Sequence, residues 1–209
     1  MSIQQFTASL DVPYLVHFTR ASNLPSILTH GLYPRSRTGE VGARPEVNDQ
    51  HRLDGHLDST SVSIAFPNCQ MFFKYRMENP NVEWAVLALD PSILWLKDCA
   101  FCRYNAADAR ISRQNINNLK TLQSLQGMYL PDADLQSRED QCLRAYDPTD
   151  VQAEVLVFDV IEPALIFGIA FDSETVKNQY AEVLGNRQVK VYSKNKSYFA
   201  QRTYSRKYE

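Results

Sequence analysis

Short apolar runs at irregular spacing are the feature that most constrains what this chain can fold into. Runs of β-branched and aromatic residues bounded by polar or turn-forming positions are typical of strands. Six such runs occur, at residues 12–18, 61–66, 83–89, 151–161, 165–171 and 187–192. Helical patterns lie among them at 22–31, 67–77, 116–128 and 173–184. Because strands and helices do not alternate one for one, the sequence predicts an α+β fold rather than a doubly wound sheet.

The distribution of charge is uneven along the 209 residues, a length that suits a single domain spanning 1–209. The net charge is −2, yet residues 186–209 contain seven basic side chains and one acidic one. Tyrosines and a phenylalanine are interleaved with these basic residues. This segment is part of the domain or appended to it. It suits a solvated tail, a contact with single-stranded nucleic acid, or a packed terminal strand.

Signature motifs of several common enzyme classes are absent from the sequence. The seven glycines form neither G-x-G-x-x-G nor a P-loop, and neither G-x-S-x-G nor H-E-x-x-H occurs. One C-x-x-C joins Cys99 and Cys102, without a second ligand pair at zinc-site spacing. We therefore expect no metal site. The lack of a secretory leader and of a membrane-length apolar run predicts a cytoplasmic location with reduced thiols.

Glu154 and His17 are the most informative polar positions in the predicted strands. Glu154 follows the polar loop 130–150 and begins an apolar strand, where a carboxylate is costly unless it is solvated, paired or used. It is either an exposed strand-end residue or a functional carboxylate at a cleft. His17 lies near the end of the first strand, where it suits a core or rim histidine or a ligand to a ribose hydroxyl.

A second polar loop, residues 33–58, supplies candidate phosphate-binding residues. Arg35, Arg37 and Arg44 make one end of this loop cationic. Arg52 suits bidentate contact with a diphosphate, or a surface pair with a neighbouring aspartate. Tyr75, on the predicted helix 67–77, either packs in the core or presents its ring to a base or a nicotinamide.

Five segments together resemble a known family, the DarT DNA ADP-ribosyltransferase toxins. The segments that carry the resemblance are LVHFTRASNLPSILTHGLYPR, NDQHRLDGHLD, SIAFPNCQMFFKYR, LDPSILWLKDCAFC and QAEVLVFDVIEP. The resemblance implies an ADP-ribosyltransferase fold, a split mixed β-sheet with flanking helices that binds NAD without a glycine fingerprint. It also implies transfer of ADP-ribose from NAD to a base in single-stranded DNA, no metal, and a macrodomain antitoxin partner, DarG.

The resemblance also implies roles for individual residues. Glu154 matches the catalytic glutamate, and Arg52 matches an arginine that holds NAD and the reacting base. The expected NAD-binding residues are His17, Phe18, Thr19, Asn23, Ile27, Arg35 and Tyr75. The expected nucleic-acid contacts are His51, Arg138, Arg144 and Tyr146.

The resemblance bears on the acceptor base as well. The first strand carries His17-Phe18-Thr19, and with the segment HRLDGHLD this is similar to the guanine-modifying type rather than the thymine-modifying type. Two other hypotheses stay open. The chain could modify RNA or protein, or it could be a nucleic-acid-binding module with an inactive cleft.

Overall fold

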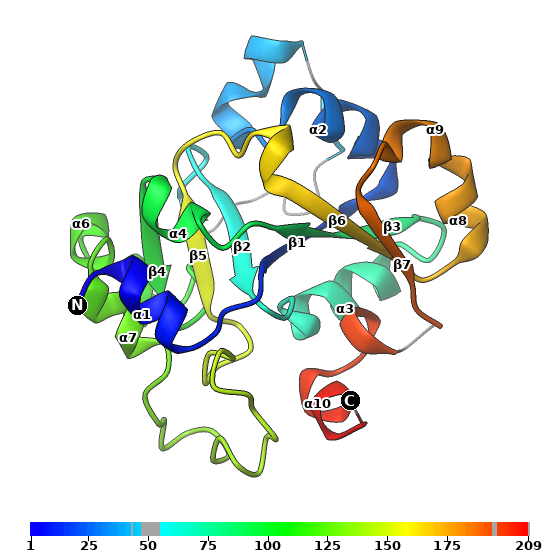
Figure 1. The fold of residues 1–209 in the computed structure, drawn as a ribbon. Coiled ribbons are helices and arrows are strands. Elements are labelled where there is room, and N and C mark those ends of the chain that lie inside the picture. Colours follow the sequence, from blue (N-terminus) through cyan, green and yellow to red (C-terminus); the bar gives the residue numbers. More distant parts are fainter. Residues whose placement is uncertain (43, 47–54, 194–195, 209) are drawn as a thin grey trace.

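A mixed β-sheet of seven strands forms the centre of the fold (Figure 1). The computed structural model describes residues 1–42, 44–46, 55–193 and 196–208. The strands are β1 Leu15–Arg20, β2 Thr60–Ile64, β3 Trp84–Leu89, β4 Cys99–Cys102, β5 Glu154–Val157, β6 Ile166–Phe171 and β7 Gln188–Val191. Their order is β4-β5-β2-β1-β3-β6-β7, antiparallel except for the parallel β6–β7 pair. The predicted α+β class is confirmed.

The sheet is split between β1 and β2. Strand β1 pairs with β3 over its whole length, but with β2 it pairs only at Leu15 with Ile64 and Val16 with Ser63. Beyond these two pairs the strands separate. One half of the sheet is therefore β4-β5-β2 and the other is β1-β3-β6-β7, which is the split arrangement that the resemblance implied.

Helices cover both faces of the sheet. The α-helices are α1 Ile3–Ser9, α2 Leu24–His30, α3 Cys69–Glu78, α4 Ile93–Leu96, α5 Ala109–Ser112, α6 Ile116–Leu119, α7 Leu122–Gly127, α8 Glu174–Gln179, α9 Ala181–Leu184 and α10 Arg202–Tyr208. Short 3-10 helices are η1 Ala21–Asn23, η2 Arg35–Val41, η3 Pro163–Leu165 and η4 Ser197–Phe199. Apolar residues of α2, α8 and α9 pack in one cluster with one face of the sheet (Figure 1). A second cluster joins α3 and η4 to the other face.

Local capping explains where α2 and α3 begin and end. Pro25 lies in the first turn of α2, and Gly31 ends this helix with φ +103°, as predicted. A side chain at Gly31 would place a Cβ atom 2.4 Å from the carbonyl oxygen of Ile161, so only glycine fits there. The side chain of Asn68 caps α3 by accepting the backbone N–H of Met71.

Three predicted elements are shorter than expected. One is the helix predicted over 173–184, which is divided at Tyr180 into α8 and α9. The strand predicted over 151–161 is limited to β5, because Asp150 accepts the backbone N–H groups of Gln152 and Ala153 and forms a turn. The helix predicted over 116–128 is two helices, α6 and α7. Thr121 separates them and caps α7 by accepting the N–H of Ser124 at 3.1 Å.

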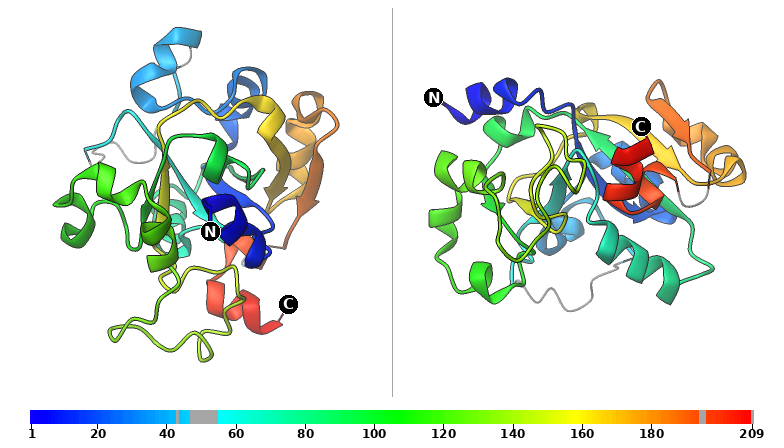
Figure 2. Two further views of the ribbon diagram at one scale, coloured as in Figure 1. Left: turned by 60° about the vertical axis from the view of Figure 1, so that its left-hand side comes forward. Right: turned by 90° about the horizontal axis from the view of Figure 1, so that it is seen from below.

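The C-terminal segment packs against the rest of the protein, which excludes the solvated-tail hypothesis for its described residues. Tyr198 and Phe199 are buried in the cluster beneath α3. Helix α10 lies beside the loop 130–150 in both views of Figure 2. Its Arg202 is 3% exposed and donates to the carbonyl oxygens of Pro148 and Thr149. Burial lowers the pKa of Arg202 to about 10.

Candidate active site

A cavity of about 320 Å³ lies where the two halves of the sheet separate. Its walls come from β1, α2 and α3 on one side, and from β2, β5 and the segment after β4 on the other. Eight residues singled out from the sequence line it: His17, Phe18, Thr19, Asn23, Ile27, Arg35, Tyr75 and Glu154. The split in the sheet thus gathers residues that are 137 positions apart at the extremes, from His17 to Glu154.

Glu154 is the carboxylate of this cavity. It is the first residue of β5 and is 7% exposed, so the alternative of an exposed strand-end glutamate is wrong. The hydroxyl of Ser61 donates to Oε2 at 2.5 Å, and the side-chain amide of Asn105 donates to Oε1. Donors on both oxygens stabilise a buried negative charge that would otherwise be costly. The carboxylate is therefore held at the cavity wall in a defined orientation.

His17 contacts Ser61, the residue of β2 whose hydroxyl also binds Glu154. Its Nδ1 lies 2.8 Å from the carbonyl oxygen of Ser61. A carbonyl oxygen only accepts, so Nδ1 carries the proton of this bond. Ser61 therefore holds the carboxylate through its hydroxyl and the imidazole through its backbone, across the split in the sheet.

Thr19 and Asn23 form the polar wall at the end of β1. The amide of Asn23 donates to the Thr19 hydroxyl and to the carbonyl oxygen of Glu46, each at 3.1 Å. The backbone N–H of Glu46 returns a bond to Asn23 at 3.0 Å, and the Glu46 carboxylate pairs with Arg20 at 2.9 Å. These bonds attach the described end of the loop, residues 44–46, to the rim of the cavity.

Aromatic side chains form the wall on the α3 side. The Phe18 ring stacks on Phe72 with centroids 4.6 Å apart and lies 6.2 Å from Tyr75. Phe72 is fully buried, whereas Phe18 and Tyr75 are half-buried and line the cavity. Tyr75 therefore both packs against the core and presents its ring to the cavity, which joins the two alternatives left by the sequence.

His51 and Arg52 lie outside the described residues. The expected roles of Arg52 with NAD and of His51 with nucleic acid therefore stay predictions from the resemblance.

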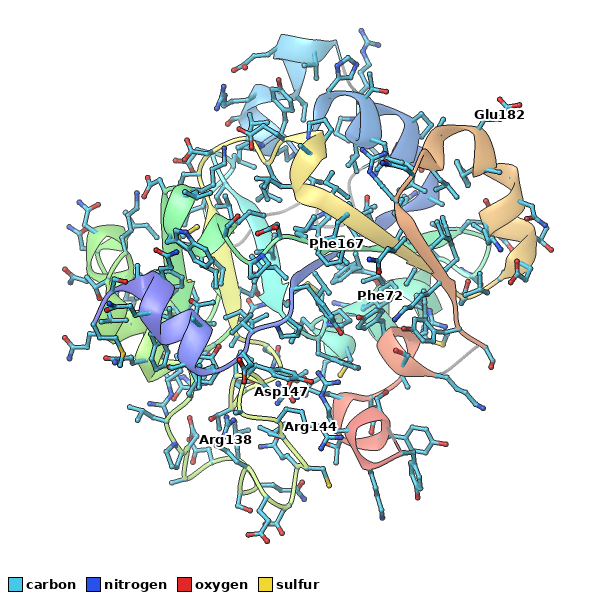
Figure 3. All side chains as sticks on the ribbon, viewed as in Figure 1. Phe72, Arg138, Arg144, Asp147, Phe167 and Glu182 are labelled. Carbon is cyan, nitrogen blue, oxygen red and sulfur yellow. The ribbon has the colours of Figure 1, made fainter. Side chains whose placement is uncertain are left out.

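Arg138 and Arg144 lie at the opposite end of the molecule from Glu182 of α9 (Figure 3). Neither they nor Tyr146 line the cavity. The guanidinium of Arg138 donates to the carbonyl oxygens of Asp147 and Arg144. Burial lowers the pKa of Arg138. Arg144 is exposed, and the Tyr146 ring lies against the guanidinium of Arg206. Their contact with nucleic acid stays a prediction.

Two residues of the site, Ser61 and Asn105, were not identified from the sequence. Ser61 and Ser63 are polar residues at alternate positions of a buried strand, which is a visible sign of a strand face lining a cavity. Asn105 has no such sign, because its place beside Glu154 depends on the pairing of β4 with β5 at Cys102 and Glu154.

Two further properties limit the kind of site. Within the ranges that the structure describes, no group of three or more histidine, cysteine or acidic residues could hold a metal ion. Over the same ranges, no helix has the length and apolar character needed to cross a membrane.

The split sheet, with the buried Glu154 of β5 lining the cavity at the split, is the arrangement expected of a protein of the ADP-ribosyltransferase class. The family model described as "ssDNA thymidine ADP-ribosyltransferase, DarT" matches residues 16–199. The chain therefore belongs to the DarT family, whose members are NAD-dependent ADP-ribosyltransferases of single-stranded DNA.

Solved structures of DarT proteins have the same fold at low sequence identity. DarTG of Thermosipho africanus in complex with ADP-ribose matches with a TM-score of 0.57 and 17% identity, over 87% of this chain and 50% of that one. DarT of Thermus sp. 2.9 in complex with carba-NAD+ matches with a TM-score of 0.57 and 16% identity, over 87% and 96% of the two chains. The same Thermus protein in complex with ADP-ribosylated single-stranded DNA matches with a TM-score of 0.52 and 16% identity, over 87% and 95%. No curated protein matches the chain.

Proposed function

We propose that this protein transfers ADP-ribose from NAD to a base of single-stranded DNA and releases nicotinamide. The observation that carries the proposal is the buried Glu154, whose two oxygens each accept a hydrogen bond at the wall of the cavity. Family membership supplies the reaction class. Thermus DarT, which shares the fold, is known in complex with carba-NAD+ and with ADP-ribosylated single-stranded DNA.

The cavity suits part of a dinucleotide. Its volume of about 320 Å³ falls at the lower end of the range for small-molecule sites, which runs from roughly 300 to 1,000 Å³. It combines an aromatic wall, from Phe18 and Tyr75, with polar groups from His17 and Thr19. Aromatic surface suits a nicotinamide ring, and the polar groups suit its ribose and amide. Arg35 and Arg52 are our candidates for the diphosphate.

Glu154 has two tasks in the proposed reaction. The bond between the ribose carbon and nicotinamide breaks, a base nitrogen forms the new bond to that carbon, and the base nitrogen loses a proton. A carboxylate beside the ribose carbon stabilises positive charge that exists mainly in the transition state. The same carboxylate accepts the proton of the base. Ser61 and Asn105 each donate a hydrogen bond to this carboxylate.

We propose guanine as the acceptor base, on the resemblance of His17-Phe18-Thr19 to the guanine-modifying type. The description of the family names thymidine, so the base needs a direct test. We also propose that a macrodomain antitoxin of the DarG kind removes the modification. The match to a DarTG chain, of which this chain covers 50%, supports that pairing.

The test is mass spectrometry of oligonucleotides incubated with NAD and either the native protein or the Glu154→Gln variant. Glutamine keeps both hydrogen bonds, because its oxygen accepts from Asn105 and its amide donates to the Ser61 hydroxyl. The variant should therefore fold normally and lose at least about 100-fold in rate.

The acceptors distinguish the hypotheses. Single-stranded oligonucleotides that each lack one base are compared with duplex DNA, RNA and a protein mixture. An adduct that requires guanine and Glu154 supports the full proposal. An adduct that requires thymine supports the DNA-modifying activity but overturns the proposal that guanine is the acceptor base. An adduct on RNA or protein alone, or NAD binding without turnover, overturns the DNA-modifying function.

A further inference from the structure

Asn105 is held by hydrogen bonds at both ends of its side-chain amide. Its Oδ1 accepts the backbone N–H of Ala107 at 3.0 Å, which closes a turn just before α5. Its Nδ2 donates to Oε1 of Glu154. Because the first bond needs an acceptor, the amide can take only the orientation in which its nitrogen faces the carboxylate.

Two elements thus hold the Glu154 carboxylate from opposite sides. Ser61 donates from β2, and Asn105 donates from the segment that follows β4, the other neighbour of β5. Asn105, Ala106 and Ala107 line the same cavity as Glu154, so this segment forms part of the wall of the proposed NAD site. Both contacts are donors, which is the pattern that favours an ionised carboxylate.

We propose that Asn105 is a positioning residue that keeps Glu154 ionised and fixes the direction of its carboxylate toward the reacting ribose. This inference rests on the proposed function for its catalytic consequence. The effect of Asn105 on the ionisation of Glu154 does not depend on the proposed function and can be measured in the protein without substrate. An aspartate at this position could accept the turn bond, but when ionised it has no donor for Glu154, whereas the amide accepts with its oxygen and donates with its nitrogen.

The Asn105→Asp substitution tests this role without removing the turn. Aspartate still accepts the N–H of Ala107, but its second oxygen faces Glu154 in place of a donor. Two carboxylates in contact cannot both ionise freely, so the pair holds a proton to higher pH. The other titratable or charged groups on the elements packed around Glu154, among the described residues, lie on β4, on the segment after it, on β1 and in the turn before β5. They are Cys99, Cys102, Arg103, Tyr104, Asp108, His17 and Asp150.

A matched control is available at Asn115. Its side chain accepts the N–H of Asn117 at 3.0 Å in the same kind of turn, but it is exposed and does not line the cavity. Asn115→Asp therefore makes the same chemical change at an exposed position outside the cavity that holds Glu154. Its activity and its pH profile should equal those of the native protein.

The first measurement is the rate of DNA modification against pH. Asn105→Asp should lower kcat at least about tenfold at pH 7, with KM for NAD changed less than about twofold. The acidic limb of its kcat profile should move up by more than about one pH unit. A native profile and a native kcat in Asn105→Asp, with the native protein active, would overturn the inference and leave the proposed function standing.

The second measurement does not depend on activity. The carboxyl carbon of Glu154 is followed by NMR in protein labelled with ¹³C-glutamate, with its signal assigned by Glu154→Gln. Its titration midpoint should rise in Asn105→Asp and stay unchanged in Asn115→Asp. If the native protein modifies no DNA but the midpoint rises, the proposed function fails and the electrostatic role stands. An unchanged midpoint overturns that role.

Discussion

Removal of either partner of the buried ion pair between Asp147 and Arg206 should lower the free energy of unfolding by several kcal/mol. Nε and Nη2 of Arg206 each lie 2.8 Å from an oxygen of Asp147, and the two side chains are 3% and 0% exposed. Arg206→Met leaves the Asp147 carboxylate buried, with the backbone N–H of Arg144 at 2.9 Å as its remaining close donor in the loop. Removal of one partner from such a buried pair costs about 3–5 kcal/mol.

Replacement of both partners should cost less than the two single changes together. In Asp147→Leu with Arg206→Met neither member of the pair is left as a lone buried charge, and apolar side chains of similar size fill the space. Arg138 and Arg202 lose their attraction to Asp147 equally in the single Asp147→Leu variant, so this loss cancels in the comparison. We expect the double variant to be at least about 2 kcal/mol more stable than the sum of the single losses predicts.

Urea unfolding at pH 7, followed by circular dichroism, measures these free energies. The exposed pair of Lys177 with Glu174, at 3.0 Å, serves as the control, and Lys177→Met should cost less than about 1 kcal/mol. A loss below about 1 kcal/mol in Arg206→Met, or additive losses in the double variant, would refute the reasoning.

Three more predictions follow from particular residues. Gly31→Ala forces a Cβ atom to within 2.4 Å of a backbone oxygen at a positive φ, and should lower the free energy of unfolding by more than about 2 kcal/mol in the same urea assay. Ser61→Ala removes one donor to Glu154, and should lower kcat about tenfold or more while the calorimetric affinity for NAD stays near native; an unchanged kcat would contradict the contact. Burial raises the pKa of Cys99 to about 12, so its thiol stays protonated and should resist iodoacetamide at pH 8 in peptide mass spectrometry, whereas the half-exposed Cys142 should react.

Local patterns predicted most of the strands and the ends of α2, because each depends on residues close in the sequence. Gly31 ends α2 where the pattern placed it, and Ser173 caps α8 by accepting the N–H of Thr175. Strand β4 was missed because its four residues, Cys99–Cys102, are too few to form a recognisable run. The division of 116–128 was missed because the apolar stripe continues across the break at Thr121.

The candidate site was predictable in part. Spacing alone left Glu154 and His17 between functional and structural roles, and the resemblance favoured the functional ones. Ser61 and Asn105 could not be found in this way, because they lie 93 and 49 residues from Glu154 in the chain. Contacts over such distances depend on strand pairing, which a single sequence does not specify.

The basic C-terminal segment illustrates a different limit. Seven basic residues predicted a possible polyanion contact, but the structure uses three of them internally. Arg187 donates to the carbonyl oxygen of Ile166, and Arg202 and Arg206 are buried against the loop 130–150. A count of charges does not distinguish a guanidinium that holds the protein's own carbonyl groups from one that meets solvent.

The attachment of α10 to the loop 130–150 also sets an order on biosynthesis. Asp147 is neutralised by a residue 59 positions later in the chain. While the ribosome has produced β5 but not α10, this carboxylate has no arginine from α10 to bury against, so the segment that leads into Glu154 stays solvated. Translation must therefore reach residues 202–208 before the loop 130–150 can bury Asp147 against its arginine, although β5 already has both of its partner strands, β2 and β4, before it in the chain.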